Sequence, residues 1–165
     1  MLAESYLIMT KTSLRTHTCG ALRQKDVGAE VALCGWLQSS RTHGNVTFLD
    51  LRDRYGTTQL VADEALKKEV QHLKRESVVR VEGVVKKKPE PNKKLETGEI
   101  EVHLSKISLL SSADVLPLDL EGHSDMTEET RLKYRYLDLR RPNMQKNMLL
   151  RHKAMMSTLN FFDKE

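Results

Sequence analysis

A chain of 165 residues, 39% hydrophobic and 30% charged, is long enough for one domain with a core and part of a second. No apolar run approaches the roughly 18 residues that a membrane-spanning helix needs, so we expect no membrane segment. The formal net charge of +4 comes from residues 1–112, with 18 Lys and Arg against 14 Asp and Glu, whereas residues 113–165 hold nine of each. This excess favours a polyanionic partner for the first part of the chain, although ordinary solubility charge explains it about equally well.

The two cysteines, Cys19 and Cys34, have neither CxxC nor metal-ligand spacing, so we expect no metal site. Such low cysteine usage indicates a reducing compartment, and we expect a cytoplasmic protein. Residues 1–13 are predicted to form a loose extension, because their apolar stretch is too short for a signal peptide. An organellar presequence remains an alternative, with Glu4 as an argument against it.

Residues 18–28 predict a short helical turn that ends at Gly28. A first strand runs from Glu30 to about Ser40, and Gly35 in its interior indicates a bend or bulge. The polar, glycine-containing residues 41–45 predict a loop. A second strand at Val46–Asp53 then turns at residues 54–56 into a third at Thr57–Ala62.

One aromatic residue falls on the outer face of the second strand. Leu49 and Leu51 share one face because successive side chains alternate, so Phe48 faces the other way, among charged neighbours. Gln59 on the third strand takes the same outer face, across from Phe48 or diagonal to it. The pair suggests a platform for stacking something flat. The alternatives are a minor apolar contact for Phe48 and an ordinary solvent-facing position for Gln59.

Helical spacing returns at residues 63–74, where Asp63 is placed to cap a helix. A fourth strand follows at residues 77–87, then a basic, proline-containing loop at 88–97 and a fifth strand at 99–110. Alternation in the fifth strand predicts buried positions at Ile100, Val102 and Leu104. It predicts exposed positions at Glu101 and His103.

Five strands with one helix between the third and fourth are the element order of the OB-fold. That fold is a small all-β Greek-key barrel that binds oligonucleotides on one sheet face. We therefore predict an OB-fold barrel at residues 14–112, with helical additions. Residues 113–126 lack periodicity and predict a hinge before a helical region at 127–165.

The helical region begins with a TEET capping pattern at Thr127 and continues to Leu139, where Arg140-Arg141-Pro142 interrupts it. A second helix is predicted from Asn143 to the end of the chain. Its apolar residues form a stripe typical of a packing face: Met144, Met148, Met155, Leu159 and Phe162. The sequence stops within this predicted helix and nothing that follows covers the stripe, so we expect a truncated chain.

Several runs together resemble the amino-terminal part of aspartyl-tRNA synthetases of the bacterial and mitochondrial type, from about Arg15 to the end. The runs are RTHTCGALR, LCGWLQSSRTHGNVTFLDLRDRYGTTQLV, TGEIEV, ADVLPLDL and RLKYRYLDLRRPNMQ. The resemblance implies that the barrel is the anticodon-binding domain of a class II synthetase and that residues 127–165 begin its catalytic domain.

The family attaches aspartate to tRNA with ATP and Mg2+, as a homodimer. The expected partner is tRNA(Asp), with tRNA(Asn) left open as a second. The later motifs that bind ATP in this family are not in these residues. We therefore expect no catalytic residue and no cofactor in this chain, and no aminoacylation by it alone.

The resemblance assigns roles to seven residues. Phe48 corresponds to the aromatic that stacks on an anticodon base, Gln59 to the amide that reads a base edge, and Glu101 to the carboxylate that reads the first anticodon base. Positions that hold the loop backbone or base edges are Arg41, Lys86 and Lys88. His43 falls where a histidine accompanies relaxed anticodon choice in some relatives.

One departure and two alternatives accompany this resemblance. Many relatives have three arginines where this chain has Ser39-Ser40-Arg41, which should weaken phosphate contacts and flatten the salt dependence of binding. The chain could instead be a free-standing OB-fold that binds single strands or a protein without specificity. It could also be a fragment whose apolar stripe drives self-association. Gln59 and Glu101 separate these hypotheses, because a nonspecific binder needs stacking and charge but no base-edge groups.

Overall fold

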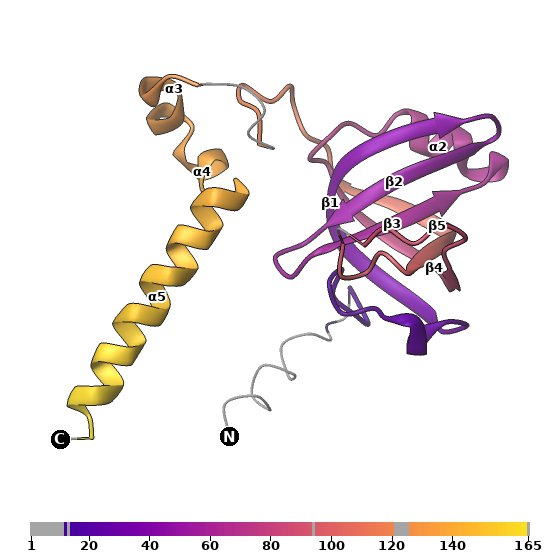
Figure 1. Ribbon diagram of the computed structural model, residues 1–165. Coiled ribbons are helices and arrows are strands. Elements are labelled where there is room, and N and C mark those ends of the chain that lie inside the picture. Colours follow the sequence, from indigo (N-terminus) through magenta and orange to yellow (C-terminus); the bar gives the residue numbers. More distant parts are fainter. Residues whose placement is uncertain (1–11, 13, 94, 121–125, 165) are drawn as a thin grey trace. The chain divides into compact units, whose positions relative to one another are not determined.

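The computed structural model describes residues 12, 14–93, 95–120 and 126–164 (Figure 1). Apart from Thr12, the predicted loose extension at residues 1–13 lies outside the described residues. The chain divides into two compact units after Asp114. Along the described part of the chain, no helix is both long and apolar enough to cross a bilayer.

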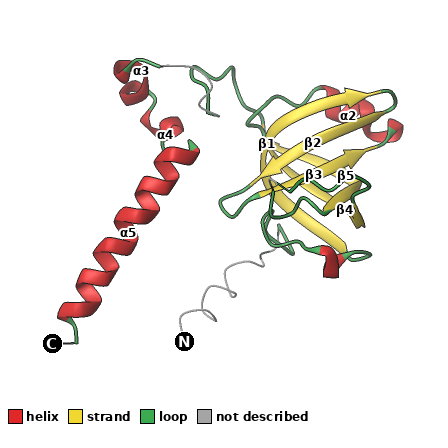
Figure 2. Ribbon diagram, viewed as in Figure 1, coloured by secondary structure: helices red, strands yellow, loops and turns green. Residues whose placement is uncertain are grey.

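The first unit is a closed five-stranded barrel with neighbour order β1-β2-β3-β5-β4 (Figure 2). The strands are β1 (Glu30–His43), β2 (Val46–Arg52), β3 (Thr57–Ala62), β4 (Val78–Lys87) and β5 (Ile100–Ser111). Pairing of β1 with β4 closes the barrel, β3 and β5 run parallel, and the other pairs are antiparallel. This topology confirms the predicted OB-fold.

The connection between β3 and β4 is helical, as predicted, but short. A 3-10 turn, η2 (Glu64–Leu66), leads into α2 (Lys67–Gln71). The carboxylate of Asp63 caps it by accepting hydrogen bonds from the backbone N–H groups of Ala65 and Leu66. Earlier in the chain, the predicted turn at residues 18–28 contains only the 3-10 helix η1 (Gln24–Asp26).

Strand alternation places the core where the sequence predicts it. Leu33, Leu49, Leu51 and Leu60 are fully buried in one cluster that fills the barrel. Gly35 occupies an inward-facing position of β1. No side chain fits there, because a Cβ atom would lie 2.4 Å from the Arg52 carbonyl oxygen. Because these leucine side chains point into the barrel, the side chains that alternate with them on β1, β2 and β3 lie on the outer face.

The first hairpin is longer than predicted. β1 continues through Arg41 to His43, which pair with Phe48 and Val46 of β2, so residues 41–43 are strand rather than loop. Only residues 44–45 turn, and Gly44 supplies the positive φ of 61° that the tight reversal needs.

The bulge in β1 also lies elsewhere than predicted. The register with β2 shifts between Leu37 and Ser39, leaving Gln38 as the extra residue, whereas Gly35 pairs regularly with Val79 of β4. After this bulge the odd-numbered residues of β1 face outward, which puts Arg41 and His43 on the same face as Phe48.

The second unit contains α3 (Glu128–Lys133), α4 (Arg135–Asp138) and α5 (Pro142–Phe162). Thr127 Oγ1 caps α3 by accepting a hydrogen bond from Thr130 N at 3.3 Å. Leu118 and Leu120, within the predicted hinge at residues 113–126, are buried against Leu137 in a small core. Residues 121–125 of that hinge lie outside the described residues.

Asp138 joins the three helices through its fully buried carboxylate. Its oxygens accept from the guanidinium groups of Arg131 at 3.1 Å, Arg135 at 2.7 Å and Arg141 at 3.4 Å. Burial alone would raise the pKa of Asp138, but the three guanidinium groups outweigh it and hold the pKa below its ordinary value.

The predicted apolar stripe lies along α5. Met148, Met155, Leu159 and Phe162 are between 48% and 71% exposed, and Met144 is half-buried beside the Arg131 guanidinium.

Candidate nucleic-acid interface

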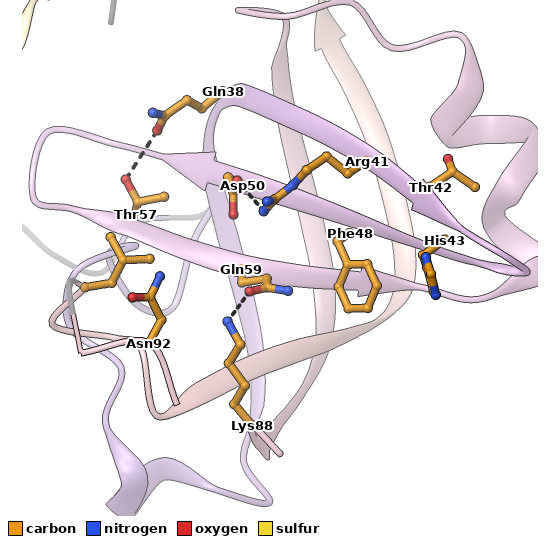
Figure 3. A pocket seen from close by; sticks show the side chains of 11 residues that line it. Gln38, Arg41, Thr42, His43, Phe48, Asp50, Thr57, Gln59, Lys88 and Asn92 are labelled. Atoms are coloured by element: carbon orange, nitrogen blue, oxygen red, sulfur yellow. Dashed lines mark hydrogen bonds and ion pairs between the residues drawn. The ribbon is translucent and has the colours of Figure 1, made fainter. Parts of the chain in front are cut away.

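A cleft of about 560 Å3 lies on the outer face of β1, β2 and β3, beside the loop that follows β4 (Figure 3). Four lining residues come from β1 (Gln38, Arg41, Thr42 and His43), two from β2 (Phe48 and Asp50), two from β3 (Thr57 and Gln59) and three from the loop (Lys88, Asn92 and Leu95). Five of the seven residues predicted to bind the ligand therefore meet in one place: Arg41, His43, Phe48, Gln59 and Lys88.

Phe48 lies in this cleft because of its parity on β2. Its neighbour Leu49 is 0% exposed, whereas Phe48 is half-buried on the opposite face, paired with Arg41 of β1 and Val61 of β3. In Figure 3 its ring lies between the side chains of Gln59 and His43. The ring is therefore outside the barrel core, as predicted, in a position where a planar group can stack on it.

Gln59 is diagonal to Phe48, because its partner in the register is Asp50, two residues further along β2. The Lys88 ammonium group donates a hydrogen bond to Gln59 Oε1. An ammonium group cannot accept a hydrogen bond, so this contact fixes which end of the amide is the oxygen. Gln59 Nε2 is then the donor end of the amide in the cleft.

The carboxylate of Asp50 connects the strands at the edge of the cleft. Asp50 Oδ2 accepts from Ser39 Oγ at 2.5 Å and from the Arg41 guanidinium at 3.3 Å. The Arg41 side chain is 68% exposed, so the ion pair is weak and the cation remains accessible to an anionic ligand. Arg41 and Lys88 therefore supply positive charge beside the ring of Phe48.

Glu101 was predicted to be exposed, and this prediction is wrong: the residue is only 7% exposed. Its burial is particular to its position on β5, because Ser105 and Lys106 of the same strand are exposed. The Glu101 carboxylate is 2.9 Å from His103 Nε2, and Lys86 is its register partner. Neither Glu101 nor the exposed Lys86 lines the cleft.

Sequence reasoning missed six lining residues: Gln38, Thr42, Asp50, Thr57, Asn92 and Leu95. Asp50 shares the parity of Phe48, so alternation could have found it. Gln38 enters through the bulge, and Asn92 belongs to a loop held by a hydrogen bond from Asn92 N to Gly98 O at 2.9 Å. Those two positions depend on backbone geometry that periodicity does not encode.

The cleft combines three kinds of group that bind an unpaired nucleotide. The half-exposed ring can stack on a base, the amide donor can hydrogen-bond to a base edge, and the two cations can contact phosphate. Among the described residues, no group of three or more His, Cys, Asp or Glu side chains is placed to hold a metal ion.

Comparisons with known proteins agree with the barrel fold. Residues 31–110 match a family described as OB-fold nucleic acid binding domain, and residues 127–165 match one described as tRNA synthetases class II (D, K and N). An aspartate–tRNA(Asp/Asn) ligase from Rhodopirellula baltica is 49% identical over 157 residues, covering 90% of this chain and 26% of the relative. One from Thermotoga maritima is 52% identical over 155 residues, covering 91% and 26%.

Among solved structures, asparaginyl-tRNA synthetase from Pyrococcus horikoshii complexed with asparaginyl-adenylate superposes with a TM-score of 0.80 at 26% identity. The match covers 93% of this chain and 35% of that one. The chain thus spans about a quarter of the length of the curated relatives it matches.

Proposed function

Because the chain belongs to the aspartate–tRNA ligase family and contains its anticodon-binding OB-fold domain and the start of its class II synthetase domain, we propose that the cleft binds a tRNA anticodon loop. The observation that supports this most directly is the diagonal arrangement of Phe48 and Gln59 on one outer face, flanked by Arg41 and Lys88.

Each side chain contributes a different part of the recognition. An anticodon base stacks on Phe48, an interaction that contributes about 1–3 kcal/mol per base. Gln59 Nε2 donates to an acceptor on the edge of a neighbouring base, while Lys88 holds the amide oxygen. Arg41 and Lys88 contact phosphates. Glu101 and Lys86 lie outside the cleft lining, so their roles in base reading stay predictions.

The wider proposal concerns the whole protein. We propose that it attaches aspartate to tRNA(Asp) with ATP and Mg2+, acts as a homodimer and works in the cytoplasm. Acceptance of tRNA(Asn) is a further hypothesis, tied to His43 at the rim of the cleft.

Binding of short RNA hairpins tests the proposal. The chain should bind a hairpin that carries the aspartate anticodon more tightly than one with the same stem and a scrambled loop, because Gln59 can pair with only some base edges. Fluorescence anisotropy of labelled hairpins at fixed salt measures both affinities. Equal affinities would instead indicate an OB-fold that binds single strands without specificity, since stacking and charge alone do not distinguish the loops.

A further inference from the structure

A second cleft, of about 380 Å3, lies on the barrel, and the function proposed above does not use it. Its lining includes two aromatic side chains, Trp36 and Tyr55, and two arginines, Arg15 and Arg54.

Trp36 lies on the outer face of β1, half-buried and outside the cluster that fills the barrel. The guanidinium carbon of Arg52, the next outward residue of β2 after Asp50, lies 5.7 Å from the centre of the Trp36 ring. A guanidinium plane beside an indole forms a composite surface on which a nucleic-acid base can stack, because both parts are flat. An ion pair of 2.8 Å with the buried carboxylate of Glu76 holds the Arg52 guanidinium in this position.

Tyr55 repeats the arrangement in the turn between β2 and β3. Its side chain is 39% exposed, and the guanidinium carbon of Arg15 lies 5.7 Å from the centre of its ring. The buried carboxylate of Asp53 fixes this turn by accepting from Tyr55 N at 2.7 Å and Gly56 N at 3.1 Å, and it also lies 3.5 Å from Arg15. The second aromatic surface is therefore held in place by the fold.

The two clefts are adjacent along β1 and at the turn that leads into β3. On β1, Gln38 lines the first cleft and Trp36, two residues earlier, lines the second. At the start of β3, Thr57 lines the first and Tyr55, again two residues earlier, lines the second. One strand of RNA can therefore pass from one cleft to the other.

The charge of the second cleft suits the same partner. Two cations line it, the exposed Arg54 and Arg15, against one carboxylate, Asp53, which is already engaged by backbone N–H groups. Arg52 lies outside the lining and is paired with the buried carboxylate of Glu76 at 2.8 Å. An excess of guanidinium groups beside aromatic rings favours an anionic ligand with planar rings, which is the chemistry of a nucleotide.

We propose that this second cleft, bounded by Trp36, Tyr55 and Arg54, receives a nucleotide that flanks the anticodon in the same RNA. Its base stacks on the aromatic–guanidinium surface and its phosphate is held by Arg54. This inference rests on the proposed function, because the first cleft sets the position of the RNA.

Trp36 is the single tryptophan of the chain, so tryptophan fluorescence reports on the cleft that this residue lines. Titration with the aspartate-anticodon hairpin should quench the emission with the same midpoint as the anisotropy titration, because a stacked base quenches indole fluorescence. The unpaired anticodon triplet alone, which has no flanking nucleotides, should leave the emission unchanged at saturation.

Two variants add an independent test. Arg54→Ala should lower the slope of log affinity against log salt by about 1, and Tyr55→Ala should weaken hairpin binding by about tenfold. Lys68→Ala is the matched control, because Lys68 is exposed on α2 and lines neither cleft. It should leave the affinity unchanged.

The outcomes separate the two proposals. The second proposal is overturned if the hairpin binds tightly and in an anticodon-dependent way without quenching, and if Arg54→Ala and Tyr55→Ala bind like the parent chain. That result would leave the proposed role of the first cleft unaffected. Failure of the parent chain to distinguish the two hairpins would instead count against the proposed function, and with it against this inference.

Discussion

The side chains of Phe48 and Leu49 are one residue apart on β2 and have opposite environments. Leu49 is fully buried among the barrel leucines, while Phe48 lies half-buried in the cleft. An apolar residue that contributes little to the core is free to be selected for a ligand contact. Because one residue packs the core and its neighbour lines the cleft, substituting each in turn tests the site directly.

Phe48→Ala should weaken binding of the anticodon hairpin by about 1–3 kcal/mol, the value of one stacked base, with little change in the free energy of unfolding. Leu49→Ala is the matched control, and it should cost about 2–5 kcal/mol of stability because it leaves a cavity in the core. Hairpin titration and thermal unfolding of both variants measure the two effects. A strongly destabilised Phe48→Ala chain would place the ring in the core and refute its role as a platform.

At single residues, sequence reasoning succeeded where burial on one face decides orientation. Phe48, Leu51 and Gln59 all lie on the predicted faces, because a one-residue shift would turn the leucines to water. It failed for Glu101, which is buried with its carboxylate against His103 Nε2 and with Lys86 of β4 as its register partner. The register of β4 with β5 places Lys86 opposite Glu101, and alternation within one strand does not reveal it.

At the scale of elements, the sequence located the strands of the barrel but not the full length of β1. Residues 41–43 are polar, so the apolar pattern ends before the hydrogen-bonded ladder does. The bulge at Gln38, which turns Arg41 and His43 toward the cleft, has no glycine to mark it. The site therefore depends on a backbone irregularity that could not be predicted from residue types.

The helices of the second unit depend on the ionised form of Asp138. Its pKa is lowered in the folded chain relative to its ordinary value of 3.8, so its stabilising contribution is fully present above that pH. The contribution is lost as the pH falls below 3.8 through the lower pKa of the folded state. Acid titration followed by the helical circular dichroism signal should show this loss, whereas the signal of Asp138→Asn should lack the same transition.

The same substitution has an expected cost near neutral pH. Asp138→Asn leaves three guanidinium groups around a neutral amide, and it should destabilise the helices by about 1–3 kcal/mol, since the arginines are partly exposed. Asp163→Asn is the control, because Asp163 is exposed just after α5. Equal thermal unfolding of the helices in the two variants would show that the arginine cluster around Asp138 contributes nothing.

At the scale of the whole chain, the two units differ in their exposed surfaces. The barrel carries the cationic clefts, while α5 exposes an apolar stripe in which Leu159 is 58% and Phe162 is 71% exposed. A stripe of this kind favours association in water. Self-association and RNA binding should therefore be separable properties of the two units.

Removing the residues after Asp114, where the first unit ends, should abolish concentration-dependent association and preserve hairpin binding. This end point is preferable to one within residues 121–125, since a longer fragment would keep Leu118 and Leu120 but lose their cover, Leu137. Sedimentation velocity over a range of concentrations measures association, and anisotropy measures RNA affinity. In the intact chain, Leu159→Lys should weaken association without removing any element. If the trimmed barrel still associates, the self-association surface lies on the barrel and not on α5, and association should then compete with RNA binding.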